Sequence, residues 1–426
     1  MNSVVAVVLS AATSLSAATP EARQVYGIAW TAPAVELGPC ALSVLLPASE
    51  AEKCKPWTQR EASGPAFHDS LGVLVVGGSD KYLRVLDARD GHKLWEKKTP
   101  GAVLAQPVIN DDGAYFGTDD ARVMRVDVAT GNERWVTAVD AEVTEPVVVH
   151  GDVVYVVTGN DSTYALSRLT GEPLWVNKHP LPRGITLRGQ SKPLVLDVAG
   201  ADGGMRLFVG HASGLLVVLD RETGAVISEI DLSRGDAFGD IDADPVFQAN
   251  RNVVVAASQT RGITALDPRT TTEVWHNPES GLTRLATGGE PMLVAAGAGK
   301  VLGLDAATGQ TRWRFTFEKG APTRIVVKGG RVHVGSDRGA LYVLDLYSGR
   351  PLQYAGSAAG VAADLSLAND MLFFTSLSGT VIAMSSAWAG RISSGPRDVE
   401  HLQDRNTPTA ASPPVAATRG AGSTLP

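Results

Sequence analysis

A repeated pattern constrains the fold of this chain more than any other feature. Eight times along the 426 residues a short apolar run ends in an aspartate or in a residue that takes its place. In a complete copy, VLDARDGHKLW, Gly91 follows Asp87 by four residues and Trp95 follows four residues later. Successive copies are 40, 40, 53, 47, 38, 40 and 40 residues apart. A period in this range indicates a propeller or a solenoid.

The copies differ in ways that leave the period intact. Ser167 replaces the aspartate in one copy, whereas Ser228 and Gln353 replace the tryptophan in two others. The last copy, around Ser385, is degenerate. The pattern therefore predicts eight structural units.

Each unit reads as one propeller blade of four antiparallel strands, called A to D from the inner strand outward. A short strand, often opened by proline, precedes an alternating strand that ends in a Gly, Asn or Asp turn, as in VHVGSD. Residues of these types tolerate the positive φ of tight hairpin turns. A single blade cannot bury both of its faces, so the blades must stack around an axis. The tryptophan that begins strand D is then predicted to pack between blades.

The two ends of the chain are expected to meet. The eighth unit has no recognisable strand D, whereas the segment VYGIAWTAP near the N-terminus carries an unpaired Trp30. If this segment supplies the missing outer strand, the ring is closed by joining the chain ends. We therefore predict an all-β, eight-bladed propeller of four-stranded antiparallel blades over residues 25–390, closed by an N-terminal strand.

Composition agrees with one large β domain and narrows its partners. The chain is 44% hydrophobic and 19% charged, with 45 glycines, and rings of this size are ordinary single domains. A net charge of −7 argues against non-specific binding to nucleic acid. No later apolar stretch reaches the length of a membrane-spanning helix, so we expect membrane contact to be peripheral at most.

Three segments lie outside the repeats. Residues 1–18 resemble a secretory signal with cleavage after Ala18, which predicts export. An insertion over residues 36–62 carries Cys40 and Cys54, which could form a disulfide in an exported protein or remain two free thiols. Residues 391–426 are rich in Pro, Ala, Ser, Thr and Gly, and we expect them to be a disordered tail, either a tether or a remnant.

Motifs for catalysis, metals or cofactors are not found. The eight histidines show no metal-ligand spacing, and neither a Cys-x-x-Cys pair nor a Gly-x-Ser-x-Gly elbow occurs. Asp240, Asp242 and Asp244 suggest a calcium loop, but Pro245 stands where that loop needs glycine and Arg251 where it needs a bidentate Glu. We therefore predict no catalytic residues, no metal site and no cofactor.

The informative irregularity is the length of two connections between blades. From the tryptophan position to the next inner-strand proline, two early copies span 12 and 11 residues, whereas the copies ending at Pro193 and Pro245 span 18 and 17. All D-to-A connections of a propeller emerge on the same face, so these two neighbouring long connections are expected to lie side by side.

The residues of the two connections suit a protein interface. The first presents Ile185, Leu187 and Arg188, and the second presents Asp240 and Asp242. Apolar anchors beside an arginine and two carboxylates can bind a partner through charge-assisted hydrogen bonds. An internal Arg–Asp bridge that only rigidifies the connections explains the same residues, and on the residues alone both readings stay open.

The repeats resemble the PQQ-type β-propeller superfamily, and the two connections resemble the BamB family within it. ITLRGQSKP (Ile185 to Pro193) and GDIDADPV (Gly239 to Val246) are similar to that family's L-x-L-R-G-x-S-x-P and D-x-D-x-x-P-V segments, in the same order. The resemblance covers roughly residues 25 to 388. Ile185 stands where the family has a leucine, a change that conserves volume.

The resemblance implies a non-catalytic periplasmic scaffold, peripheral to the outer membrane. BamB-like propellers bind a POTRA domain of BamA and assist the assembly of outer-membrane β-barrel proteins, whose unfolded chains would be the clients. In this sequence Ile185, Leu187, Arg188, Asp240 and Asp242 would form the BamA-binding surface. The family's lipidated cysteine after the signal has no counterpart, because Thr19 stands there, so the resemblance gives no support to a lipid anchor.

Two other functions share the repeats. A quinoprotein dehydrogenase would be an enzyme, but such enzymes resemble one another in a vicinal Cys-Cys pair and a set of carboxylates that this chain does not show. An exported propeller could also bind some other protein or a glycan through its loops.

Overall fold

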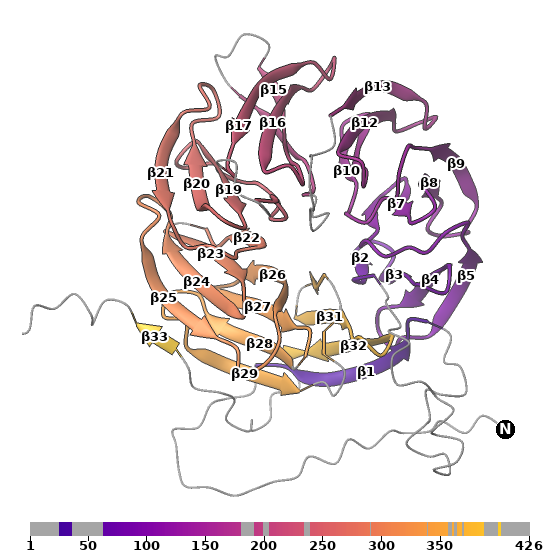
Figure 1. Ribbon diagram of the computed structural model, residues 1–426. Helices are drawn as coiled ribbons and strands as arrows, with labels where there is room; N and C mark the ends of the chain where they lie inside the picture. The colour runs from indigo at the N-terminus through magenta and orange to yellow at the C-terminus, as the bar shows by residue number, and fades with distance from the viewer. Residues whose placement is uncertain are drawn as a thin grey trace, which may run out of the picture.

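The chain is an eight-bladed β-propeller, as the repeats predict. The computed structural model describes residues 25–35, 63–179, 191–198, 204–233, 239–289, 291–338, 340–356, 360–361, 364–368, 370–386 and 399–401. Eight antiparallel sheets surround one axis, and successive blades follow one another around the ring (Figure 1). Within these residues no helix is long and apolar enough to cross a membrane.

The first four blades each contain four consecutive strands, ordered from the axis to the rim. Blade 1 has β2 (Ala66–His68), β3 (Val73–Gly77), β4 (Tyr82–Asp87) and β5 (Lys93–Lys98); blade 2 has β6 (Val108–Asn110), β7 (Gly113–Thr118), β8 (Arg122–Val126) and β9 (Glu133–Ala138); blade 3 has β10 (Val148–His150), β11 (Val153–Val157), β12 (Ser162–Ser167) and β13 (Pro173–Lys178); blade 4 has β14 (Leu194–Asp197), β15 (Met205–Gly210), β16 (Leu215–Asp220) and β17 (Val226–Asp231).

The remaining blades follow the same order, except that blade 8 takes its outer strand from the N-terminus. Blade 5 has β18 (Val246–Gln248), β19 (Val253–Ser258), β20 (Gly262–Leu266) and β21 (Glu273–Asn277); blade 6 has β22 (Arg284–Thr287), β23 (Met292–Gly297), β24 (Lys300–Asp305) and β25 (Thr311–Thr316); blade 7 has β26 (Pro322–Lys328), β27 (Arg331–Ser336), β28 (Ala340–Asp345) and β29 (Pro351–Gly356); blade 8 has β30 (Ser366–Ala368), β31 (Met371–Thr375), β32 (Thr380–Ser385) and β1 (Gly27–Pro33).

The ring is closed by the N-terminal strand. β1 pairs antiparallel with β32, with Thr31 opposite Ile382 and Ala32 opposite Val381 (Figure 1). The indole nitrogen of Trp30 donates to the carbonyl of Ala88 in blade 1, 3.0 Å away. The predicted outer-strand position of Trp30 is therefore confirmed.

The repeated aspartate shapes the turn between strands C and D. The Oδ1 of Asp127 accepts hydrogen bonds from the backbone nitrogen and the hydroxyl of Thr130, both at 2.9 Å. At the Ser167 position the hydroxyl oxygen accepts one from the backbone of Thr170 at 3.3 Å. A short polar side chain that bonds to the backbone two or three residues later favours a turn, which explains why the pattern needs this residue type.

The repeated tryptophan and glycine meet across neighbouring blades. Trp135 of blade 2 donates its indole N–H to the carbonyl of Arg168 in blade 3 at 3.0 Å and lies against Gly171. A Cβ on Gly171 would lie 2.6 Å from the indole, and the φ of this glycine is +76°. Both the missing side chain and the positive φ therefore require glycine. The predicted packing role of the tryptophan is confirmed.

The two copies without tryptophan use other contacts at the same place. Ser228 of blade 4 faces Thr271, which takes the glycine position of blade 5 with a φ of +58°, and their hydroxyl oxygens are 3.3 Å apart. Gln353 of blade 7 is buried and binds both backbone groups of Tyr26, just before β1: Tyr26 N–H donates to its Oε1 and its Nε2 donates to the Tyr26 carbonyl, each at 2.7 Å. At both junctions the residue in the tryptophan position and the residue that it contacts therefore differ from the usual Trp–Gly pair.

Several sequence expectations fall outside the described residues. These are the signal over residues 1–18, the insertion over 36–62 with Cys40 and Cys54, and most of the tail from residue 391. Within that tail, β33 (Val399–His401) pairs antiparallel with β25 and extends blade 6 to five strands. The outer edge of blade 6 offers the backbone groups that these three residues pair with, and the expectation of a disordered tail stays a prediction.

We expect the junction between blades 4 and 5 to behave as a matched pair. Ser228→Trp alone should destabilise the protein, because Thr271 occupies the space over which an indole would lie. Adding Thr271→Gly should recover stability, with a coupling energy of about 0.5–3 kcal/mol in a double-mutant cycle measured by urea unfolding. As a control, Ile227→Trp on the exposed side of β17 should not couple to Thr271→Gly. Equal coupling in both cycles would contradict the assignment.

A second prediction concerns ring closure. Gln353→Leu keeps the volume but leaves the backbone N–H and carbonyl of Tyr26 without partners, which should cost about 2–4 kcal/mol of unfolding free energy. Hydrogen exchange in β1 should accelerate more than in β2. Gln310→Leu, at an exposed position, is the control. Unchanged exchange in β1 would show that Gln353 does not hold the closing strand.

Candidate functional site: two long connections and the axial cavity

The first long connection joins β13 to β14. Residues 180–190 of it are not among those described, so Ile185, Leu187 and Arg188 lie outside the described residues. Its ends are described: His179 follows β13, and Ser191 and Lys192 precede β14.

The second long connection joins β17 to β18 and carries Asp240 and Asp242. Asp240 is only 1% exposed, and Asp242 is partly buried. The carbonyl of Asp240 accepts a hydrogen bond from the backbone N–H of Gln259 at 3.1 Å, and Oδ2 of Asp242 accepts one from Nε2 of Gln259 at 2.8 Å. Gln259, in the turn after β19, therefore fixes the shape of this connection, a role that the sequence pattern did not suggest.

Burial also changes the titration of Asp242. Desolvation raises the pKa of this carboxyl above its usual value, the hydrogen bond from Gln259 opposes that shift, and the neighbouring Asp240 adds to it. Asp240 and Asp242 thus stabilise the second connection through contacts on the side that faces the protein interior.

The described ends of the two connections lie next to each other. The backbone N–H of Lys192 donates to Oδ1 of Asp244 at 2.7 Å. Ile241 packs against Gly210, and Ser191 donates its hydroxyl to the carbonyl of the same glycine at 3.3 Å. The expectation that the long connections are neighbours on one face therefore holds at their bases.

A pair of histidines lies beneath both connections. His179 and His211 meet edge to face with ring centroids 4.8 Å apart, and His211 is fully buried. The backbone N–H of Ile241 donates to the carbonyl of His211 at 3.2 Å, which ties the pair to the second connection. Burial, and then His179, lower the pKa of His211 to about 3, so this ring is neutral at physiological pH. The scattered histidines of the sequence gave no sign of this pair.

Asp161 belongs to the same buried region. Its Oδ1 accepts a hydrogen bond from the backbone of Ala212 at 3.2 Å, and burial raises its pKa to about 6. In the part of the chain that the structure covers, no three His, Cys, Asp or Glu side chains are grouped to hold a metal ion. The contact that joins this region to the second connection is the hydrogen bond from Ile241 to the carbonyl of His211.

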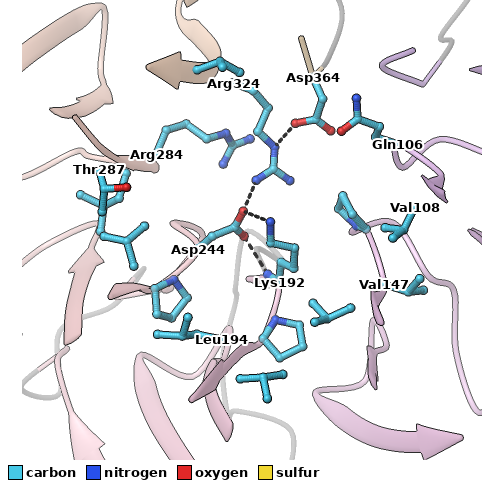
Figure 2. Close-up of a pocket in the computed structure, with 18 of the residues that line it drawn as sticks. Gln106, Val108, Val147, Lys192, Leu194, Asp244, Arg284, Thr287, Arg324 and Asp364 are labelled. Carbon is cyan, nitrogen blue, oxygen red and sulfur yellow. Dashed lines mark hydrogen bonds and ion pairs between the residues drawn. The ribbon is translucent and has the colours of Figure 1, made fainter. Parts of the chain in front are cut away.

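The axis of the ring holds a cavity of about 680 Å³ (Figure 2). Aliphatic side chains of the inner strands form its walls, among them Val108, Leu194 and Val246. Seven successive blades each contribute one polar residue at or just before the inner strand. These side chains point to the axis or contact one another there. They are Gln106, Glu145, Lys192, Asp244, Arg284, Arg324 and Asp364. The repeat therefore places one polar group near the axis in seven of the eight blades.

Arg324 is the centre of this polar ring. Its Nη1 donates to Oδ2 of Asp244 at 2.6 Å, and its Nε pairs with Oδ1 of Asp364 at 2.8 Å (Figure 2). Its Nη2 pairs with Oε2 of Glu145. These groups come from blades 3, 5, 7 and 8. A guanidinium with its donors spread over three carboxylates matches the fork geometry of arginine, which lysine lacks.

Three carboxylates around one guanidinium do not ionise equally. Burial raises the pKa of Glu145 to about 7, although Arg324 opposes this shift, and Asp244 and Asp364 reinforce it. For Asp244 burial acts in the same direction, but Arg324 and Lys192 outweigh it, so its pKa is lowered. When the cluster binds a proton, Glu145 is therefore the carboxylate that takes it up, and Asp244 stays ionised.

The raised pKa of Glu145 predicts a pH dependence of stability. Between about pH 4.5 and pH 7 the folded protein retains a proton that the unfolded chain has lost, so this group makes stability fall as pH rises through that window, by at most ~1.4 kcal/mol per pH unit. Glu145→Gln should remove the slope, measured by urea unfolding at several pH values. Glu133→Gln, on the exposed rim, is the control. An unchanged slope in Glu145→Gln would contradict the assignment.

Comparisons with known proteins support the same fold and identify the family. The sequence profile described as outer membrane protein assembly factor BamB matches residues 50–136, 79–314 and 297–416. The BamB of Yersinia pestis is 26% identical over 357 residues, 78% of this chain and 88% of that protein, and the BamB of Escherichia coli K12 is 24% identical over 340 residues, 75% and 84% respectively.

Solved structures are similar in fold. The crystal structure of BamB from Moraxella catarrhalis superposes with a TM-score of 0.66 at 22% identity, covering 77% of this chain and 99% of that one. A quinohemoprotein alcohol dehydrogenase from Comamonas testosteroni superposes with a TM-score of 0.63 at 14% identity, covering 88% and 78%. Likeness at this identity shows the propeller alone. The sequence profile, which spans most of the ring, shows more: the chain belongs to the BamB family of outer membrane protein assembly factors.

Proposed function

We propose that this protein is a non-catalytic periplasmic scaffold that assists the assembly of β-barrel proteins at the outer membrane. The observation that carries the proposal is the match of the family profile across residues 50–416, together with relatives that are named as assembly factors. The expected signal over residues 1–18 supports export to the periplasm.

The partner in this proposal is a POTRA domain of a BamA-like protein, with unfolded outer-membrane proteins as clients. Leu187 and Arg188 would contact it directly, with Ile185 beside them. Asp240 and Asp242 would act by holding the second connection in shape, because one is buried and the other is bound to Gln259. The adjacency of Lys192 and Asp244 supports a single surface made from both connections.

Quinoprotein dehydrogenase activity is the competing function, since one such enzyme has the same fold. The axial cavity of this chain is crossed by the Arg324 cluster, in which each guanidinium nitrogen already pairs with a carboxylate. This arrangement favours a scaffold over a redox centre on the axis. Absorbance spectra of the purified protein with added quinone distinguish the two functions, because bound quinone would absorb and a scaffold would leave the spectrum unchanged.

The scaffold proposal predicts which side chains the partner needs. Leu187→Ala/Arg188→Ala should weaken binding to the purified POTRA region of the same organism's BamA by at least tenfold, because truncating an apolar anchor together with a charged neighbour removes a binding hot spot. Biolayer interferometry measures this affinity. Thermal unfolding should stay within a few degrees of wild type, since both residues fall between the end of β13 at Lys178 and the start of β14 at Leu194 in the sequence.

A matched control changes the opposite face. Leu169→Ala/Arg89→Ala alters two exposed residues in C-to-D turns. Leu169 is 77% exposed, and the side chain of Arg89 is 87% exposed. This variant should bind the POTRA region like wild type. If both double variants bind equally well, the long connections are not the partner surface.

A further inference from the structure

The three axial carboxylates engage all three guanidinium nitrogens of Arg324. Its Nη1, Nη2 and Nε each engage a different carboxylate, on Asp244, Glu145 and Asp364. Arg324 is therefore not the group that would receive a ligand in the cavity.

Arg284 is a cation in the cavity whose N–H donors are not all paired. Its Nη1 donates to the carbonyls of Thr283 at 2.7 Å and Asp242 at 3.3 Å, and its Nε is buried without a hydrogen-bond partner. Within the described part of the chain no carboxylate forms an ion pair with it. A buried guanidinium donor without a hydrogen-bond partner costs free energy. A ligand in the cavity that supplies an acceptor would remove that cost.

Lys192 adds a second cation at the same end. Its Nζ is 3.9 Å from Oδ2 of Asp244, at the limit of an ion pair, and its side chain is 43% exposed. Both Lys192 and Arg284 line the cavity, and Figure 2 shows them on either side of Asp244. Two cations with donor capacity therefore stand at one end of the cavity.

The rest of the cavity is lined mostly by apolar side chains, with His150 and Thr287 as polar residues at the far ends of β10 and β22. Its walls include Val108, Val147, Leu194, Leu285 and Ile325, all branched aliphatic side chains of the inner strands or the residues beside them. A volume of about 680 Å³ lies within the range of small-molecule sites, roughly 300–1,000 Å³. Mostly aliphatic walls with the charged groups gathered at one end suit a ligand with an apolar body and a charged head.

We propose that the axial cavity binds a small amphiphile with an anionic head, a carboxylate or a phosphate, held by Arg284 and Lys192, and an aliphatic body packed against the inner strands. This site goes beyond the proposed scaffold function and does not depend on it. Each of the two cations would gain an acceptor from the anionic head.

The local charge permits such an anion. Lys192, Arg284 and Arg324 balance Glu145, Asp244 and Asp364 when all six are ionised. Because burial favours the protonated form of Glu145, the cluster becomes net positive as pH falls toward 6. Binding of an anion should therefore strengthen as pH falls from 8 to 6, whereas binding of a cation should weaken.

Four probes with the same eight-carbon body separate the head groups: octanoate, octyl phosphate, octylammonium and octanol. Isothermal titration calorimetry on the full chain should give one site per ring for octanoate or octyl phosphate, at least tenfold tighter than octylammonium and octanol. The tighter of the two anions identifies the preferred head. Equal affinity for all four probes, or tighter binding of octylammonium, would overturn the proposal.

Two kinds of variant locate the site. Arg284→Gln and Lys192→Gln should each weaken binding of the preferred anion about tenfold, whereas Arg312→Gln, on the exposed side of β25, should not change it. Val246→Trp fills the cavity from its apolar wall and should abolish binding while circular dichroism shows an intact fold. This variant keeps the test valid if Arg284→Gln fails to fold. Unchanged binding in Val246→Trp and Lys192→Gln would place the ligand elsewhere and end the proposal.

Discussion

The contact between the tryptophan of one blade and the glycine of the next is the interaction on which the rest of the structure depends. The indole donates to a carbonyl in the neighbouring C-to-D turn and covers a backbone with positive φ, so it fixes both the spacing and the rotation of the two blades. A hydrophobic surface alone would allow sliding, because burial of apolar area has no direction. The junction at Ser228 and Thr271 keeps a polar contact instead, and Gln353 uses two hydrogen bonds to hold the strand that closes the ring.

This regular stacking determines where a change in loop length appears. Every D-to-A connection emerges on one face, so lengthening two successive connections brings their bases together without any special pairing between them. The hydrogen bond from Lys192 to Asp244 then joins the two bases, and Ile241 packs beside Ser191. A surface for a partner can thus arise on a propeller by insertions between blades. Most core residues come from the strands, although Leu232 and Ile241 of the second connection also belong to a core cluster.

The sequence allowed prediction of the features that follow from local periodicity. The blade number, the outer position of Trp30 and the adjacency of the long connections depend on spacing, turn residues and strand direction. The structure agrees with the first two and, at the described bases of the connections, with the third. The axial cluster could not be predicted in this way, because Arg324 and Glu145 are 179 residues apart and meet only when the ring closes. A partial signal existed: the residue before the inner-strand proline is charged in Glu145, Lys192 and Asp244. The inward direction of Asp240 depends on a turn in another hairpin, which spacing does not reveal.

The axial cavity and the long connections share residues, which has an energetic consequence. Asp244 ends the second connection and is bound to Arg324, while Arg284 lines the cavity and donates to the carbonyl of Asp242. A ligand that draws Arg284 toward the cavity would therefore weaken its hold on the base of the second connection. Coupling between two binding sites is reciprocal in free energy, so a partner seated on the connections would change the affinity of the cavity by the same factor. The coupling would act through a single hydrogen bond, from the guanidinium of Arg284 to the carbonyl of Asp242, and would need no movement of the blades.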